Sequence, residues 1–479
     1  MSNVIWTPQP RQIAFQSRPE YEALYGGAAG GGKSEALVAE ALRQVHIPNY
    51  GGLVLRKTYP QLTELIDKST GIYKRAFPGA RYNGSSHIWT FPSGATIRFG
   101  SMHRTADRHQ YDGHQYDFIG FDELTHFLWE EYSYMFSRNR PKGPGTRVYM
   151  RATTNPGGVG HGWVKDRFIT AAKPMTPIRG VMKIVGPDGK EFEIIRKRIF
   201  VPSTVFDNQI LLKNDPNYLA NLSMLPEAER DALLYGSWDS FQGQVFREWK
   251  SDAEHYTDRI NTHVINPFKI QDSWRIYRGF DFGYAKPFSV GWWAIDHDKR
   301  MYRIRELYGC TDQPNTGVKW TPQEIARKIK QVESEDENLK GKRVIGIADP
   351  SIYDESRGES IARMMEREGV YFDRGDNKRL PGKMEMHYRL SFDDGGLPMM
   401  YIFHTCKHFI RTIPSLVYSE VDPEDVDTDG EDHVYDEARY VAMENPIAPR
   451  QVKERVAKQY NPLDDEPKYD RYDFYRMGN

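Results

Sequence analysis

The stretch GGAAGGGKS, residues 26–34, decides the fold of the first half of the chain. It fits the pattern G-x-x-x-x-G-K-[ST], in which glycines let the backbone wrap around phosphate oxygens with its N–H groups pointing inward. Residues 22–25 can form a short strand and residues 35–45 a helix, so the phosphates would lie at a helix N-terminus. The pattern predicts a nucleotide site in which the lysine neutralises phosphates and the serine hydroxyl holds Mg²⁺. The residues predicted to bind the nucleotide here are Gly27, Gly30, Gly31, Gly32, Lys33 and Ser34.

An apolar strand that ends in two acids, DFIGFDE at residues 117–123, predicts a second element for nucleotide hydrolysis. Asp122 would hold Mg²⁺ through water, and Glu123 would polarise the attacking water. A later strand, VYMRA, is followed by TTNPGG, and polar residues at the C-terminal end of a strand lie beside the nucleotide in such sheets. Thr154 or Asn155 would sense the γ-phosphate there, while Asn-Pro-Gly-Gly alone is equally typical of a plain turn.

The order of apolar runs predicts an α/β protein with two domains. Short strands alternate with helical stretches over the first 240 residues, which favours a mainly parallel sheet, and a β-rich insertion around Pro187-Asp188-Gly189 predicts a hairpin. A three-stranded meander over residues 275–308, followed by mixed helices and strands, predicts a second α/β domain. The expected divisions are a first domain at 1–240, a linker at 241–272, a second domain at 273–450 and a tail at 451–479.

Composition narrows the functional classes. No stretch of the 479 residues approaches the ~20 apolar residues that a membrane helix needs, and the N-terminus lacks an export signal pattern. Cys310 and Cys406 are the only cysteines, which argues against a disulfide scaffold or a zinc site and suits a reducing cytoplasm. The net charge of −1 leaves any DNA-binding face to a local patch or to an assembly of several subunits.

Three acids of the second half stand where cation chemistry would need them. Asp281 ends the first meander strand, Asp349 ends the strand VIGIA, and Asp436 lies on a late helix with His433 one turn earlier. Carboxylates brought together repel one another, so such a group requires cations, and hard oxygen ligands suit Mg²⁺ or Mn²⁺. Two such ions can activate water and stabilise the leaving oxygen in phosphodiester cleavage. Taken singly, each acid is more often a solvated charge; the alternative ligands are Glu306, Asp432 and Glu437.

With these motifs in place, the chain resembles the large terminase subunit of tailed bacteriophages over about residues 6–448. The landmarks occur in the order of that family and are more specific together than the glycine-rich loop alone. They are GGAAGGGKS, LVLRKTYPQL, GFDELTHF, RATTNPGG, YGSWDSFQGQVF, RGFDFGYAKP, IADPS and DHVYDEARY.

The resemblance implies an additional-strand, catalytic-glutamate ATPase followed by a ribonuclease-H-like nuclease. It implies ATP-driven translocation of double-stranded DNA into a procapsid, with cleavage of concatemeric DNA at the start and finish. It assigns the catalytic glutamate to Glu123 and the coupling motif to Thr153–Asn155. The nuclease acids become Asp281, Asp349 and Asp436, with His433 near the metals, Gln12 as a reader of adenine and Arg56 near the nucleotide.

The same resemblance implies partners and a location. Expected are a portal protein, a small terminase subunit and a homo-oligomeric ring docked on the procapsid in the host cytoplasm. Arg104 or Arg108 would be the arginine finger that acts across subunits, although either is also a plausible surface residue. The alternative functions are a helicase fused to a nuclease, for which a second RecA-like domain is missing, and a structural protein with a degenerate nucleotide loop.

Overall fold

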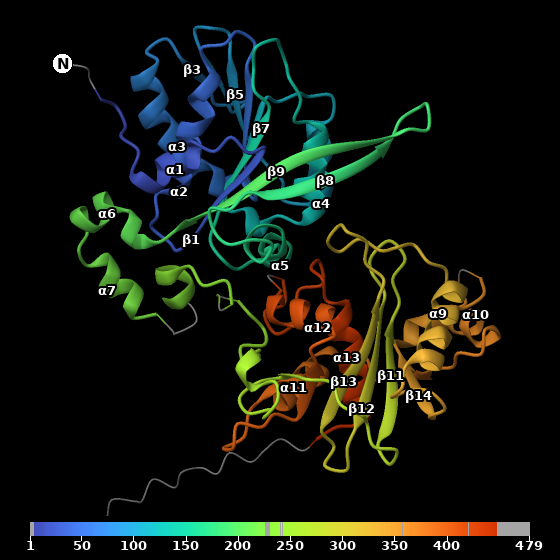
Figure 1. Cartoon of the computed structure of the whole chain (residues 1–479). Coiled ribbons are helices and arrows are strands. Elements are labelled where there is room, and N and C mark those ends of the chain that lie inside the picture. Colours follow the sequence, from blue (N-terminus) through green and yellow to red (C-terminus); the bar gives the residue numbers. More distant parts are fainter. Residues whose placement is uncertain are drawn as a thin grey trace, which may run out of the picture.

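The computed structural model describes residues 4–225, 230–239, 241, 243–356, 358–419 and 421–447, so the predicted tail at 451–479 lies outside the described residues. The chain forms two sheets, one in each half, each covered by helices (Figure 1). None of the helices in the described ranges combines the length and the apolar content needed to cross a bilayer.

The first domain is built on a nine-stranded sheet in the order β3-β4-β5-β2-β6-β7-β1-β9-β8. The six strands from β5 to β9 run parallel, and β3, β4 and β8 are antiparallel to their neighbours. Its strands are β1 (Glu22–Gly27), β2 (Gly51–Arg56), β3 (Arg81–Asn83), β4 (Ile88–Thr90), β5 (Thr96–Ser101), β6 (Phe118–Phe121), β7 (Tyr149–Thr154), β8 (Ile178–Val185) and β9 (Glu191–Ser203). Its α-helices are α1 (Pro10–Gln16), α2 (Lys33–Ala41), α3 (Tyr59–Ala76), α4 (Trp129–Tyr134), α5 (His161–Val164), α6 (Gln209–Asn214) and α7 (Tyr218–Ser223).

Both faces of this sheet are buried, which is why its central strands read as continuous apolar runs rather than alternating ones. Every residue of β1 is buried. The core on one face includes side chains of α1, α2 and α3, and the core on the other includes side chains of α4 and α5. The strand β7 lies between β1 and β6, which is the additional-strand arrangement that the resemblance implies.

The predicted hairpin is present. Its strands β8 and β9 project well beyond the sheet (Figure 1). Cross-strand pairs share a face of the ribbon, so Met182 with Ile194 and Ile184 with Phe192 form one apolar face. All four of these side chains are exposed.

The second domain is a seven-stranded mixed sheet in the order β10-β16-β13-β12-β11-β14-β15. The predicted meander is its centre, because β11, β12 and β13 are antiparallel, while β14 adds parallel to β11 and β16 adds parallel to β13. Its strands are β10 (Val264–Ile265), β11 (Arg275–Asp281), β12 (Ser289–Ile295), β13 (Met301–Tyr308), β14 (Val344–Ala348), β15 (Asp373–Arg374) and β16 (Met400–Phe403). Its α-helices are α9 (Pro322–Glu335), α10 (Ile361–Arg367), α11 (Arg379–Leu390), α12 (Lys407–Thr412) and α13 (His433–Glu444).

The segment expected to be a linker, 241–272, belongs largely to the second domain. Val245, Phe246, Ile265 and Ile270 are buried in the core of that domain. Residues 264–265 form β10, which pairs with β16. The sheet of this domain lies between α9 and α10 on one side and α11, α12 and α13 on the other (Figure 1).

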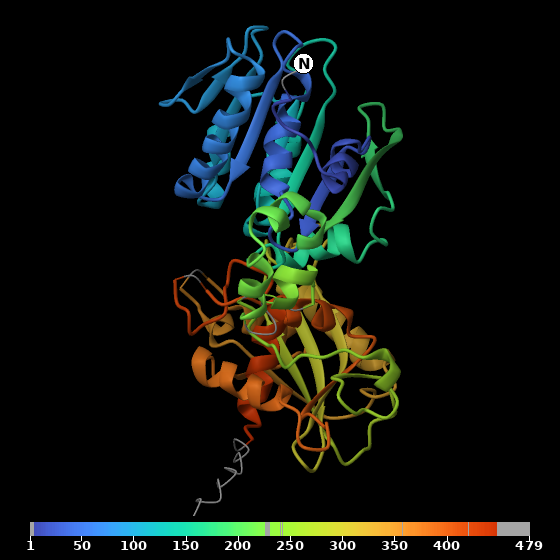
Figure 2. The same ribbon diagram turned by 90° about the vertical axis from the view of Figure 1, so that its left-hand side faces the viewer.

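The two domains meet end to end (Figure 2). The C-terminal ends of the parallel strands in the first sheet face the second domain, because β7 leads through residues 155–160 into α5, which lies at the junction. Gly162 on α5 faces Ser415, just beyond α12, closely enough that an added Cβ would lie 3.2 Å from the serine Cβ.

Candidate functional sites

The glycine-rich loop joins β1 to α2 and is closely enclosed by the rest of the first domain. Gly27 has a φ of +128° and Gly32 a φ of +70°, so both adopt backbone conformations that favour glycine. A Cβ on Gly27 would collide with the carbonyl oxygen of Ser203, and one on Gly236 would lie 2.8 Å from the Ala28 nitrogen. The first turn of α2 begins at Lys33, so its free N–H groups face the loop. This is the cradle that the sequence predicts for phosphate oxygens.

Asp122 directly follows β6, and three side chains donate hydrogen bonds to its carboxylate. Its carboxylate receives the Ser34 hydroxyl at 3.0 Å and the Thr153 hydroxyl at 2.5 Å. The Arg56 guanidinium donates to it at 2.7 Å. Ser34 and Asp122, the predicted Mg²⁺ pair, therefore face each other with hard oxygen atoms, and this donor set fits Mg²⁺.

Lys33 is buried beside this pair and donates to the Ala28 carbonyl. Burial lowers the pKa of its ammonium group, while Glu123 and Asp122 act in the opposite direction. A buried cation at the edge of the phosphate cradle suits an anionic ligand.

Glu123 is held in a strained position at the end of β6. Its φ is +54°, which is unusual for a residue other than glycine and is frequent at functional sites. Burial raises the pKa of its carboxyl group, and the neighbouring Asp122 raises it further. Asn155 donates to the Glu123 carboxylate from its backbone N–H at 3.2 Å and from its side-chain amide at 3.4 Å. The predicted coupling residue thus contacts the predicted catalytic residue directly.

The remaining nucleotide-site predictions are placed as follows. Thr154 is buried and bonds to Thr125 rather than facing the loop, with 2.8 Å between the two hydroxyls. Gln12 is buried and donates its side-chain amide to the Gly32 carbonyl at 2.8 Å. This places Gln12 at the loop, and its reading of adenine stays a prediction.

Sequence reasoning missed Asn208, whose amide donates to the Gly30 carbonyl and whose carbonyl accepts from Gln9 at 2.6 Å. Asn208 belongs to no recognisable motif and lies 178 residues away from Gly30 in the chain.

The arginine-finger candidates differ in their surroundings. Arg108 donates to Glu130 at 3.2 Å, and Arg104 is exposed.

The second candidate site lies where β11 and β14 end side by side. Phe280 pairs with Ala348 in the register of these parallel strands, so Asp281 and Asp349 follow at the same edge of the sheet. Asp436 enters from the first turn of α13. Burial raises the pKa of Asp281 to about 6, and the charges of Asp436 and Asp349 contribute to that rise. The charges of Asp436 and Asp349 thus act on Asp281, and the convergence of the three carboxylates on shared ions stays a prediction.

Each of these carboxylates is engaged by a protein group. Asp281 lies 3.1 Å from Nδ1 of His433, and Asp349 accepts from the Tyr440 hydroxyl at 3.1 Å. Asp436 accepts from Arg439 at 2.8 Å. Within the described ranges, no group of three or more His, Cys, Asp or Glu side chains is arranged to hold one metal ion directly.

The chemistry of the donors nevertheless fits Mg²⁺ or Mn²⁺, which take carboxylate oxygens. Nε2 of His433 is buried at the same place without a hydrogen-bond partner among the described residues. The metal roles of the three aspartates stay predictions.

The three alternative metal ligands differ in their surroundings. Asp432 lies within this acidic cluster, and burial together with Asp436 raises its pKa to about 8. Glu306 accepts the backbone N–H of His408 at 2.7 Å, at the start of α12. Glu437 is fully buried and pairs with Arg303 at 2.5 Å. Glu306 and Glu437 therefore have structural roles.

The fold and the two sites define a class of protein: a nucleotide-binding α/β domain with a glycine-rich phosphate loop, joined to a mixed-sheet domain that carries an acidic cluster. Comparison with known proteins narrows this class. Residues 24–251 match the family described as the terminase large subunit, T4likevirus-type, N-terminal. This match covers the first domain and names the same family as the resemblance.

Solved structures of large terminases are similar to this chain. The large terminase of a thermophilic bacteriophage is 15% identical, with 91% of this chain and 98% of that chain covered and a TM-score of 0.37. That of bacteriophage HK97 is 10% identical, with 91% and 94% covered and a TM-score of 0.43. The nuclease domain of the P22 large terminase is 18% identical, with 42% and 92% covered and a TM-score of 0.31. No curated protein matches the chain.

Proposed function

We propose that this chain is the motor subunit of a viral DNA-packaging machine. ATP hydrolysis in the first domain drives double-stranded DNA into a procapsid, and metal-dependent cleavage in the second domain cuts concatemeric DNA to make genome ends. The observation that carries the proposal is the contact of Asn155 with Glu123 beside the Ser34–Asp122 pair. It joins a hydrolytic site to the loop that leads toward the second domain.

The residues of the first site have separate tasks. The loop N–H groups and Lys33 bind the phosphates, and Ser34 with Asp122 would hold Mg²⁺, which supplies charge neutralisation when bound. Glu123 accepts a proton from the attacking water, a task for which its raised pKa suits it. Asn155 responds to changes at the Glu123 carboxylate, because Asn155 donates two hydrogen bonds to that group.

The residues of the second site are the acids at the ends of β11 and β14 and on α13. Asp281, Asp349 and Asp436 would hold Mg²⁺ or Mn²⁺, which lowers the pKa of bound water and stabilises the leaving oxygen when present. His433 orients Asp281 through the contact at 3.1 Å. Cleavage of this kind contacts the backbone and therefore has little base selectivity of its own.

The surroundings of the motor are a further part of the proposal. We place it in the bacterial host cytoplasm, as a homo-oligomeric ring docked transiently on the procapsid. There it would work with a portal protein and a small terminase subunit, and one subunit would contribute an arginine finger to its neighbour.

A separation of activities tests the proposal. Lys33→Ala should abolish ATP hydrolysis and spare Mn²⁺-dependent cleavage of plasmid DNA, and Asp281→Asn should do the reverse. The matched controls are Lys68→Ala and Asp272→Asn, because both side chains are at least one-third exposed and lie outside the two sites. ATP hydrolysis that survives Lys33→Ala contradicts the nucleotide assignment. Strand displacement on a forked duplex would favour a helicase instead.

A further inference from the structure

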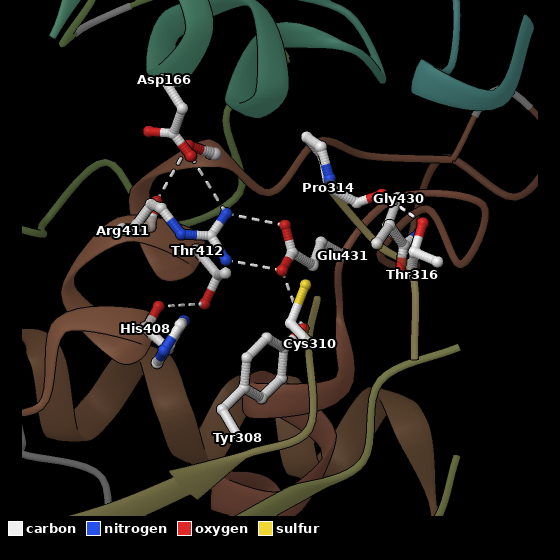
Figure 3. Close-up of polar contacts among 12 residues, drawn as sticks. Asp166, Tyr308, Cys310, Pro314, Thr316, His408, Arg411, Thr412, Gly430 and Glu431 are labelled. Atoms are coloured by element: carbon white, nitrogen blue, oxygen red, sulfur yellow. Dashed lines mark hydrogen bonds and ion pairs between the residues drawn. The ribbon is translucent and has the colours of Figure 1, made fainter. Parts of the chain in front are cut away.

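A single arginine joins the two domains at their junction (Figure 3). The Arg411 guanidinium donates to Glu431 at 2.7 Å through Nη1 and at 2.5 Å through Nη2. The same Nη1 donates to Asp166 of the first domain at 3.2 Å. Such a fork fixes both direction and distance, because its donors lie in one plane. The position of Glu431 is therefore tied to that of Asp166.

On the side of the second domain, Glu431 directly precedes Asp432 and His433 of the acidic cluster. It also accepts the Tyr308 hydroxyl from the end of β13 at 2.9 Å. His433 contacts Asp281 at 3.1 Å. α13 begins at His433 and carries Asp436 in its first turn. A shift of Glu431 would therefore displace His433 and Asp436.

On the side of the first domain, Asp166 lies in a π-helical turn directly after α5. The loop before α5 starts at Asn155, which contacts Glu123, and this loop has little freedom to move alone. The Gly157 N–H donates to the ring of His161 at 3.0 Å, and the Gly160 N–H donates to the Thr125 carbonyl at 2.7 Å. A Cβ on Gly160 would collide with the carbonyl oxygen of Phe127.

A second ionic contact between the domains comes from the loop that follows Asp281. Lys286, in the loop after Asp281, donates to Glu130 of the first domain at 3.2 Å. Glu130 also accepts from Arg108 at 3.2 Å. Both of these ionic contacts therefore involve segments next to the acids of the second site.

We propose that Arg411 is a positioning residue for DNA cleavage, which sets the start of α13 against Asp281 and, through Asp166, makes that setting depend on the nucleotide state of the first domain. The inference rests on the proposed function of both sites. A chain of contacts does not by itself demonstrate coupling between sites, so the decisive quantity is the response of cleavage to the nucleotide.

The test uses the full chain. Cleavage of plasmid DNA is measured in Mn²⁺ with no nucleotide, with ADP and with a slowly hydrolysed ATP analogue, and ATP hydrolysis is measured in parallel. The variants are Asp166→Asn, which removes the charge and keeps the shape, and Arg411→Lys, which keeps the charge and loses the fork. Their controls are Asp239→Asn, which is paired with Lys165 in the first domain, and Arg327→Lys on α9, which is paired with Glu368.

For the wild type we expect cleavage rates that differ among the nucleotide states. Asp166→Asn should remove that difference and leave ATP hydrolysis unchanged. Arg411→Lys should lower the cleavage kcat on the order of tenfold at an unchanged KM for DNA, because a point charge cannot hold both partners. In the double variant, Asp166→Asn should add nothing to the effect of Arg411→Lys.

Three results would overturn the inference: wild-type cleavage that ignores the nucleotide, a nucleotide response that survives Asp166→Asn, or an unchanged kcat in Arg411→Lys. Failure of the proposed function looks different, since the wild type itself would then lack cleavage or ATP hydrolysis.

Discussion

Replacing Glu437 by glutamine should destabilise the second domain strongly, although the two side chains are almost the same size. Glu437 is fully buried and accepts hydrogen bonds from Arg303 at 2.5 Å, from the Trp293 indole at 2.7 Å and from the Ser289 hydroxyl at 3.4 Å. A glutamine offers one acceptor oxygen in place of two and turns an NH₂ group toward one of these donors. It also leaves the buried Arg303 without its closest counter-charge, and breaking a buried pair in this way costs about 3–5 kcal/mol.

Hydrogen exchange measured by mass spectrometry is the appropriate assay, because it reports each domain separately. The amides of β12 and α13 should lose protection by this amount in Glu437→Gln, while those of β1 and β6 serve as an internal reference. Glu355→Gln is the matched control, because its pair with Arg363 is exposed and should contribute less than about 1 kcal/mol.

A companion variant separates the cause from mere loss of packing. Replacing Arg303 and Glu437 together by methionine should recover part of the loss, because removing both charges leaves none uncompensated. A Glu437→Gln protein within about 1 kcal/mol of the wild type would refute the reasoning. So would a double variant that is less stable than the single one.

Three further outcomes follow from the two sites. Without divalent ions, the stability of the wild type relative to Asp281→Asn should fall as the pH rises from 4 through about 6. The folded-state pKa of Asp281 lies above its ordinary value of 3.8, so folding favours the protonated form. A pH-independent difference between the two proteins in urea unfolding would contradict this. Asn155→Ala should lower the kcat of ATP hydrolysis on the order of tenfold at unchanged nucleotide affinity, since it removes a hydrogen bond to Glu123, and an unchanged kcat would count against it. Gly236→Ala should weaken nucleotide binding measured by calorimetry, because its Cβ would press on the loop backbone, whereas Gly145→Ala, with a positive φ and open space around it, should not.

Much of the fold could be predicted because its signals are local. The strands at Glu22–Gly27, Gly51–Arg56, Phe118–Phe121 and Tyr149–Thr154 are apolar runs bounded by loops. The strands β3 and β4 were not predicted, because three residues each are too few to show a strand pattern.

The prediction of a linker at 241–272 was wrong for a related reason. Its buried residues, such as Phe246 and Ile265, are isolated anchors without helical or strand periodicity.

The candidate sites show the same division between local and distant signals. Phosphate binding fixes the spacing of Gly32, Lys33 and Ser34 within one loop, and the acids at strand ends follow from the order of the strands. The partners from distant segments have no such signature. Arg411 and Asp166 are 245 residues apart, and Arg56 and Asp122 are 66 apart. Only the folded chain brings these pairs together.

The ribbon formed by β8 and β9 has a consequence for work with the purified protein. A two-stranded ribbon has no second layer to cover it, so the face made by Met182, Ile184, Phe192 and Ile194 meets water, and patches of this kind bring molecules together as they are concentrated. Threonine at Ile184 and Phe192 keeps strand propensity and removes much of that adhesiveness. A preparation changed in this way should remain dispersed at concentrations where the natural chain forms aggregates.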